Sequence, residues 1–285
     1  MSCAHKRFAA ALWLTAVGAA IAILAPSASA GSAASCPSGG TPAPGSTITG
    51  GLEVDGLCQL TDVTITGGIT VDATSASLLS SGVQNAAVLN GATVNGSVVV
   101  GSGSAVFAGV DLSNGNLTHD PSTIDGRVTL NASGFALADT TVRGGLTKNG
   151  AFDWPSICDG DPSCFGFNFL CDSEVFGDVT VRDVNTEKVF LGDPREHQFA
   201  NGDCVGNTIH GSVFLDNTNF VSFDGEPSEI EGETITGTVH LDHSTAEVNE
   251  NTIGGSLLCT SGTVIFPPMG PDVGGNAVRG QDTCD

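Results

Sequence analysis

The chain repeats a short pattern in which apolar and polar residues alternate, and the pattern returns ten times. A typical copy reads Thr, then Ile or Val, any residue and Gly, followed by apolar residues at alternate positions. Well-preserved copies begin at Thr47, Thr93, Thr208 and Thr234. Such alternation, with β-branched residues on one side, predicts β-strands that bury one face.

Each copy contains one glycine that we call the marker glycine. When the copies are aligned on this glycine, their apolar positions coincide. Ile or Val stands two positions before each marker glycine, and apolar residues follow at alternate positions. A single short strand cannot bury its face alone, so the copies predict a stack of about ten coils in an all-β solenoid. We expect the glycine at a corner too tight for a Cβ atom. The marker glycines are Gly50, Gly67, Gly96, Gly126, Gly144, Gly177, Gly211, Gly237, Gly255 and Gly280.

Apolar stretches between the copies are expected to form the other walls of each coil. They include residues 105–107, 189–191 and 221–223. A sandwich of antiparallel hairpins is the structural alternative. It gives no reason for the apolar columns to align, so the solenoid is preferred.

The first 30 residues have the pattern of a secretory signal peptide. Lys6 and Arg7 precede an apolar stretch, and Ala28–Ala30 form a small-residue cleavage signal. An uncleaved membrane anchor is the alternative. No second apolar run of about 20 residues follows, so we expect a secreted protein without a membrane span after processing. Residues 31–46 are expected to be a flexible lead-in, and residues 47–285 the solenoid domain with an insertion at 147–173.

Eight cysteines remain after the signal segment, an even number that predicts four disulfides in an oxidising compartment. Cys259 and Cys284 each lie four residues after a marker glycine, so neighbouring coils would place them in one column. The other expected pairs are Cys171–Cys204, Cys158–Cys164 and Cys36–Cys58. Lipidation of Cys36 is the alternative for the first cysteine, but it would leave an odd thiol.

The charge of the chain is strongly acidic, with 31 Asp and Glu residues against 9 Lys and Arg and a formal net charge of −22. A surface of this sign repels phosphate backbones, so nucleic acid is not an expected partner. It also repels polyuronates. Solubility of an exported protein is a sufficient reason for the acidity.

The repeated phrase, the glycine punctuation and the uneven coil lengths resemble secreted bacterial proteins of the right-handed parallel β-helix type. The export signal and the ending N-A-V-R-G-Q-D-T-C resemble exported proteins of actinobacteria. Bactofilins have a similar V-x-G-x-V rhythm but lack an export signal and disulfides. The resemblance implies a right-handed helix for nearly all of residues 46–285 and implies no particular chemistry.

Carboxylates recur five positions after the marker glycine and form the first candidate site. Stacking would place Asp216 over Asp242 and Asp55 over Asp72, about one strand spacing apart. Stacked turns explain such a column, since Asp and Asn end strands. The functional interpretation is a Ca²⁺ site, and otherwise no cofactor is expected. The same spacing would suit the carboxylate pair of a retaining glycosidase.

Histidines near these carboxylates could suggest a zinc site, but their positions along the strands argue against it. His210 precedes its marker glycine by one residue and His240 follows its own by three, so one zinc ion cannot bridge them. Exposed strand histidines are the preferred interpretation.

The insertion at 147–173 is the second candidate site, because recognition is often carried by loops that project from a rigid scaffold. A small satellite core that caps a coil is the alternative. We expect a structural or binding module for a cell-envelope glycan or surface protein rather than an enzyme; a polysaccharide lyase or glycoside hydrolase on a β-helix scaffold is the alternative. The aromatic candidates are Phe152, Trp154, Phe165, Phe167 and Phe169.

Overall fold

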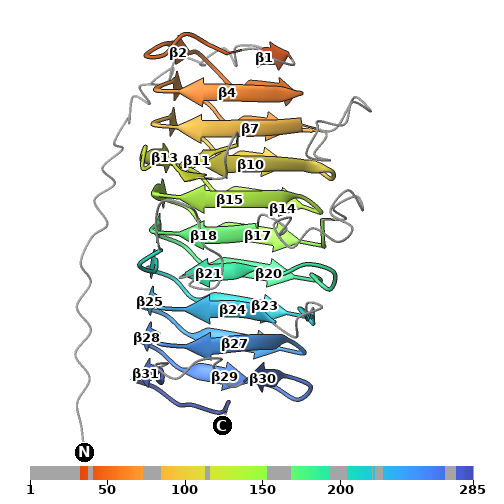
Figure 1. The fold of residues 1–285 in the computed structure, drawn as a ribbon, viewed down its shortest axis with the longest axis vertical. Coiled ribbons are helices and arrows are strands. Elements are labelled where there is room, and N and C mark those ends of the chain that lie inside the picture. Colours follow the sequence, from red (N-terminus) through yellow and green to blue (C-terminus); the bar gives the residue numbers. More distant parts are fainter. Residues whose placement is uncertain are drawn as a thin grey trace, which may run out of the picture. The chain divides into compact units, whose positions relative to one another are not determined.

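The computed structural model describes residues 33–37, 41–72, 85–112, 116–152, 168–192, 204–219, 221, 227–266 and 274–284. The chain divides into residues 1–30 and 31–285, and the second unit holds every described residue. Its described secondary structure consists of β-strands in three long sheets, in which all neighbouring strands are parallel. This is the parallel β-helix that the repeated pattern predicts (Figure 1).

Each coil contributes one strand to each of three sheets, which we call A, B and C. Sheet A contains β1 (Ala34–Pro37), β3 (Leu52–Asp55), β6 (Ile69–Val71), β9 (Val98–Val100), β14 (Val128–Asn131), β17 (Leu146–Asn149), β20 (Val179–Arg182), β23 (Val213–Asp216), β26 (Val239–Asp242) and β29 (Leu257–Cys259). Sheet B contains β2 (Thr47–Ile48), β5 (Thr64–Ile65), β8 (Thr93–Val94), β13 (Ser122–Ile124), β16 (Thr140–Val142), β19 (Glu174–Val175), β22 (Thr208–Ile209), β25 (Thr234–Ile235), β28 (Thr252–Ile253) and β31 (Ala277–Val278). Sheet C contains β4 (Leu57–Thr61), β7 (Asn85–Asn90), β10 (Ser104–Ala108), β15 (Gly134–Ala138), β18 (Asn168–Cys171), β21 (Phe190–Gly192), β24 (Ser228–Glu231), β27 (Thr245–Asn249) and β30 (Val264–Phe266). A short antiparallel hairpin of β11 (Val110–Asp111) and β12 (Asn116–Leu117) lies outside these sheets.

The register of the sheets confirms the predicted columns. Val128 pairs with Val98 on one side and with Leu146 on the other, and Ile65 pairs with Ile48 and Val94. These inward residues join the inner face of sheet C in one apolar core that runs through the stack. Burial of their side chains is the main source of stability for such a fold.

Between its edge strands β4 and β30, sheet C is buried on both faces, which the alternating pattern of sheets A and B does not predict. Its strands β10 and β15 are buried at every position. The inner residues belong to the main core, and the outer ones form a second apolar cluster that includes Phe107, Phe169 and Phe190. Strands with two covered faces lose the alternation of apolar and polar residues.

Two segments differ from the expected organisation. Residues 34–37, expected within a flexible lead-in, form β1, which pairs with β3 and extends sheet A by one strand. The expected wall at residues 221–223 is supplied instead by β24, which pairs with β21 and β27. Of that stretch the structure describes Val221, which forms an antiparallel bridge with Pro227.

The marker glycines lie in a vertical row between sheets B and A, with each backbone directly against the next. The amide of Gly144 donates to the carbonyl oxygen of Gly126, and the amide of Gly177 donates to that of Gly144. A Cβ atom on Gly144 would lie 2.6 Å from the oxygen of Gly126. The glycine is therefore required by contact between successive coils, rather than by the bend of its own strand that we expected.

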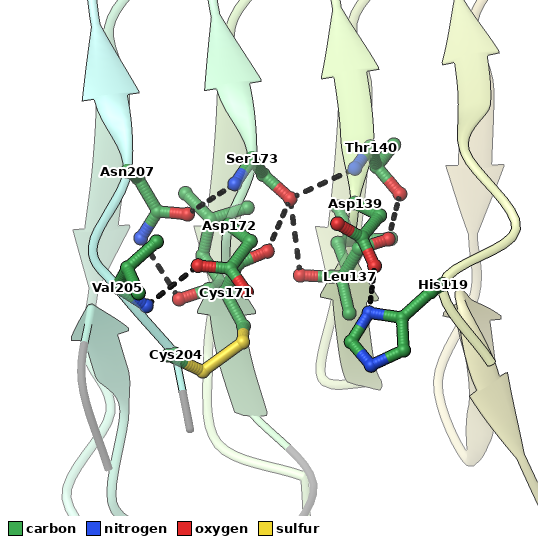
Figure 2. Close-up of a disulfide and its surroundings, with 12 residues drawn as sticks. His119, Leu137, Asp139, Thr140, Cys171, Asp172, Ser173, Cys204, Val205 and Asn207 are labelled. Atoms are coloured by element: carbon green, nitrogen blue, oxygen red, sulfur yellow. Dashed lines mark hydrogen bonds and ion pairs between the residues drawn. A yellow bond between two sulfur atoms is a disulfide. The ribbon is translucent and has the colours of Figure 1, made fainter. Parts of the chain in front are cut away.

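Three disulfides occur in the described chain, and all three are predicted pairs: Cys36–Cys58, Cys171–Cys204 and Cys259–Cys284. The predicted pair Cys158–Cys164 lies outside the described residues. Figure 2 shows Cys171, the last residue of β18, bonded to Cys204 of the next coil. The disulfides therefore connect successive coils, as the column argument requires.

Replacing Cys171 and Cys204 together with Ala is expected to lower the free energy of unfolding. The bond closes a stretch with a sequence separation of 33. The loop-entropy relation gives a loss of about 3 to 4 kcal/mol for such a loop. Denaturant unfolding of the double variant beside the wild-type protein measures it, and an unchanged midpoint would contradict the expectation.

Candidate functional site

The predicted carboxylate pair Asp216 and Asp242 is aligned on neighbouring strands of sheet A, as the column predicts. Asp216 forms an ion pair with Arg182, with 3.8 Å between Oδ2 and Nε. Asp242 accepts hydrogen bonds from the Thr260 hydroxyl and from Nδ1 of His243. The Thr260 hydrogen bond holds the pKa of Asp242 below its ordinary value, with a smaller contribution from His243. The partners of Asp242 thus favour its ionised form.

The second pair, Asp55 and Asp72, has the same position in the repeat, in the first coils of the stack. Asp55 directly follows Val54, Asp72 directly follows Val71, and these two valines are register partners. No group of three or more His, Cys, Asp or Glu side chains that could share a metal ion occurs in the part of the chain that the structure describes. Calcium binding at these aspartates stays a prediction.

The aspartates stand at a corner of each coil. The residue after Asp216 is Asn217, with a φ of 54°, and the residue after Asp242 is His243, with a φ of 46°. A left-handed backbone conformation is a feature of tight turns, where Asp and Asn are favoured. The position of these carboxylates therefore agrees with their role in the stacked turns between sheets A and C.

The aromatic candidates of the insertion are divided by the structure. Phe152 and Phe169 are buried in the second apolar cluster against the outer face of sheet C. Trp154, Phe165 and Phe167 lie outside the described residues. The two described phenylalanines therefore pack as a satellite core, which is the alternative considered from the sequence, and are not exposed for recognition.

Exposed aromatic and imidazole rings gather instead on sheets A and B, at a surface that the sequence reasoning did not single out. Phe176 is 45% exposed, and its ring stacks on His210 of the next coil with centroids 4.5 Å apart. The Nε2 atom of His210 lies 2.8 Å from a carboxylate oxygen of Glu174. The imidazole is thereby held in place against the phenylalanine ring.

A second ring pair lies on the neighbouring sheet. Phe214 of β23 and His240 of β26 are register partners, and their rings meet edge to face with centroids 6.2 Å apart. We call Phe176, His210, Phe214 and His240 the aromatic face. His210 and His240 have different neighbours, Glu174 and Phe214.

The alternation of inward and outward positions in the repeat is the sequence signal that could have revealed the aromatic face. Phe176 stands directly before its marker glycine, a position that points outward and holds Thr in several coils. Phe214 stands three residues after a marker glycine, another outward position. A large apolar residue at an outward position has no place in the core, so its side chain must meet solvent or a partner.

The corner between sheets C and B contains a buried column of hydrogen-bonding side chains. The amide of Ser173 donates to Asn207 Oδ1, and the Ser173 hydroxyl donates to the carbonyl oxygens of Cys171 in its own coil and of Leu137 in the preceding coil (Figure 2). In the next coil Asn207 Nδ2 donates to Oε1 of Glu233 at 2.6 Å. Asn251 Oδ1 in turn accepts from the amide of Glu233. The side chains of this column accept hydrogen bonds from backbone amides at the corner, which have no partner in the sheets.

Glu233 is the one carboxylic acid in the described part of this column. It is fully buried, and its Oε2 atom has no hydrogen-bond partner among the described residues. Burial raises the pKa of Glu233 to about 8, while the hydrogen bonds from Asn207 act in the opposite direction. The acid is therefore protonated in the folded protein at neutral pH.

No family model, curated protein or solved structure matches the chain. Within the described ranges, no helix is long and apolar enough to cross a membrane.

Proposed function

We propose that the protein is a secreted structural and binding module that binds a cell-envelope glycan through its aromatic face. The observation that carries the proposal is the stack of Phe176 on His210, together with the Phe214–His240 pair on the neighbouring sheet. Exposed aromatic rings offer flat apolar surfaces to the C–H faces of sugars, and polar groups beside them can bond sugar hydroxyls. Glu174 and the imidazoles supply such groups.

The fold supports this function because it holds the face in a fixed shape. Phe214 and His240 project from strands that are hydrogen-bonded on both sides within sheet A, and Phe176 and His210 directly follow such strands of sheet B. Groups on strands keep their positions better than groups on loops, so less conformational entropy is lost when a ligand binds. The three disulfides support an oxidising, extracellular location.

Replacing Phe176 and Phe214 together with Ala is expected to weaken retention on an insoluble glycan at least about tenfold. Loss of two aromatic contacts of about 1 kcal/mol each accounts for a change of this size. Co-sedimentation of the purified protein with peptidoglycan and with cellulose measures the retention. Val99→Ala is the matched control, because Val99 is also an exposed apolar residue on the outward side of sheet A.

The same assay separates binding from catalysis when soluble sugars are measured in the supernatant. Retention without released product supports the binding module, whereas product release supports a lyase or hydrolase. Equal retention of the double variant and the wild-type protein, or no retention of either on both glycans, would contradict the proposal.

A further inference from the structure

Three polar side chains meet inside the apolar core between sheets A and C. Lys148 is on β17, Asn168 is the first residue of β18, and Glu187 precedes β21 in the next coil. All three are buried, Lys148 and Asn168 completely. Lys148 stands in a column whose members in adjacent strands are Leu130 and Val181, so an apolar residue would suit the position. Burying a lysine, an amide and an acid together in an apolar core costs free energy, so this cluster needs a specific explanation.

The carboxylate of Glu187 joins the other two side chains. Its Oε1 atom lies 2.6 Å from Nζ of Lys148, and its Oε2 atom lies 2.6 Å from Nδ2 of Asn168. Lys148 Nζ also donates to the backbone oxygen of Ser133 at 2.8 Å, and the amide of Phe152 donates to Glu187 Oε1. The amine and the carboxamide are therefore held at the two oxygens of one carboxyl group. Oδ1 of Asn168 has no hydrogen-bond partner among the described residues.

The same two columns already contain a covalent link at the first coils. Cys36 pairs with Val54 in the sheet A column that continues to Lys148. Cys58 belongs to the sheet C column that continues to Asn168. The Cys36–Cys58 disulfide therefore shows that side chains from these two columns reach each other across the interior.

Burial also favours the uncharged forms of the pair. It lowers the pKa of Lys148 and raises the pKa of Glu187, against the smaller opposing effect of their mutual attraction. A neutral amine is a nucleophile, and a protonated carboxyl group can donate a proton to a leaving nitrogen.

We propose that Lys148 and Asn168 form an intramolecular isopeptide bond, with Glu187 as the catalytic acid and base. Nζ of Lys148 attacks Cγ of Asn168, and the carbonyl electron pair moves to Oδ1. Oε1 of Glu187 accepts a proton from Nζ, and Oε2 delivers the proton of the Glu187 carboxyl group to Nδ2. The electron pair on Oδ1 re-forms the carbonyl as the Cγ–Nδ2 bond breaks with its own pair on nitrogen, so ammonia leaves and Glu187 is again protonated. The balance is amine plus carboxamide giving substituted amide plus ammonia, so no oxidant or co-reactant is needed.

The product ties β17 to β18 across the inside of one coil. It replaces an amine that is costly to bury with an amide, which stays neutral at any pH. The reaction is accelerated because the folded chain holds the two reacting groups next to each other. The bond is thus formed by folding and stabilises the middle of the stack within one coil, whereas the disulfides connect successive coils.

Intact-mass measurement of the purified wild-type protein, with peptide mapping, tests the proposal. The expected mass is one ammonia below the sum of the residues after correction for disulfides. A branched peptide should join the segments that contain Lys148 and Asn168. Asn168→Asp should lose one water instead of one ammonia, a change that a misfolded variant cannot produce.

The variants Lys148→Met and Glu187→Gln are expected to show neither loss, because one lacks the nucleophile and the other lacks the acid. Methionine is chosen since its length and apolar character suit the column. A wild-type protein with its full mass and no branched peptide would overturn the proposal. A bond that still forms in Glu187→Gln would overturn the role of Glu187, and an ammonia deficit that persists in Lys148→Met would assign the loss to another site.

Discussion

Replacing Glu233 with Gln is expected to raise the free energy of unfolding by about 5 kcal/mol above pH 8, the largest stabilisation we predict. In the folded protein the ionised carboxylate would be fully buried, with one oxygen that has no partner among the described residues. Gln keeps an oxygen that can accept the hydrogen bond from Asn207. It carries no charge at any pH, so the cost of burying an ionised group disappears.

The pH dependence has a definite sign. The pKa of Glu233 is raised from the ordinary value of 4.5 to about 8 in the folded state. The folded protein therefore holds a proton that the unfolded chain releases, and its stability falls as the pH rises from 4.5 to 8. Below pH 4.5 both states are protonated, and the difference between Glu233→Gln and the wild-type protein should vanish.

Denaturant unfolding of both proteins at pH values from 4 to 9 (a range of about five units around the two pKa values) measures this difference. Glu53→Gln is the matched control, because Glu53 is exposed on sheet A and the substitution removes the same charge. A constant difference between Glu233→Gln and wild type across the range would contradict the raised pKa of Glu233.

Replacing Gly144 with Ala is expected to lower the free energy of unfolding by more than about 4 kcal/mol, an exceptional effect for a single added methyl group. The new Cβ would lie 2.6 Å from the Gly126 oxygen, 2.7 Å from its carbonyl carbon and 2.8 Å from the amide nitrogen of Arg127. All three atoms belong to backbone, so no side-chain rotation can relieve the contact. The coils must separate, which weakens the hydrogen bonds between the marker glycines.

Gly275→Ala is the control for the glycine prediction. A Cβ on Gly275 would meet no atom within 4 Å, and its φ is not in the left-handed region. Its stability should stay within about 0.5 kcal/mol of wild type. Thermal and denaturant unfolding of the two variants compare them directly, and equal stability of Gly144→Ala and Gly275→Ala would refute the close contact between coils.

The columns show how far local pattern specifies this fold. A period of two identifies the buried side of sheets A and B, and the marker glycine fixes the register between coils. That register was sufficient to predict the pair Cys259–Cys284. The pattern fails in sheet C, because strands that are covered on both faces have no alternation to read. It also fails at β1, where a segment rich in small residues becomes ordered by pairing with β3.

The candidate sites depended more strongly on the structure. The sequence favoured the aromatic residues near 152–169 because they interrupt the repeat, yet Phe152 and Phe169 pack against sheet C. Phe176 and Phe214 follow the repeat and were overlooked, although their outward positions leave Phe176 exposed and Phe214 half-buried. The aspartate column was located correctly, but only the structure showed that Asp216 and Asp242 have Arg182, Thr260 and His243 as partners.

The amino-acid sequence alone determined the all-β class, the parallel stacking of about ten coils and the disulfide pairs that follow from it. These depend on periodicity and register, which are properties of one chain read in order. Only the tertiary structure decided which side chains meet across the interior, such as Lys148, Asn168 and Glu187. Such contacts depend on how the three sheets close around the core, and this closure brings together residues at separations that no local pattern encodes.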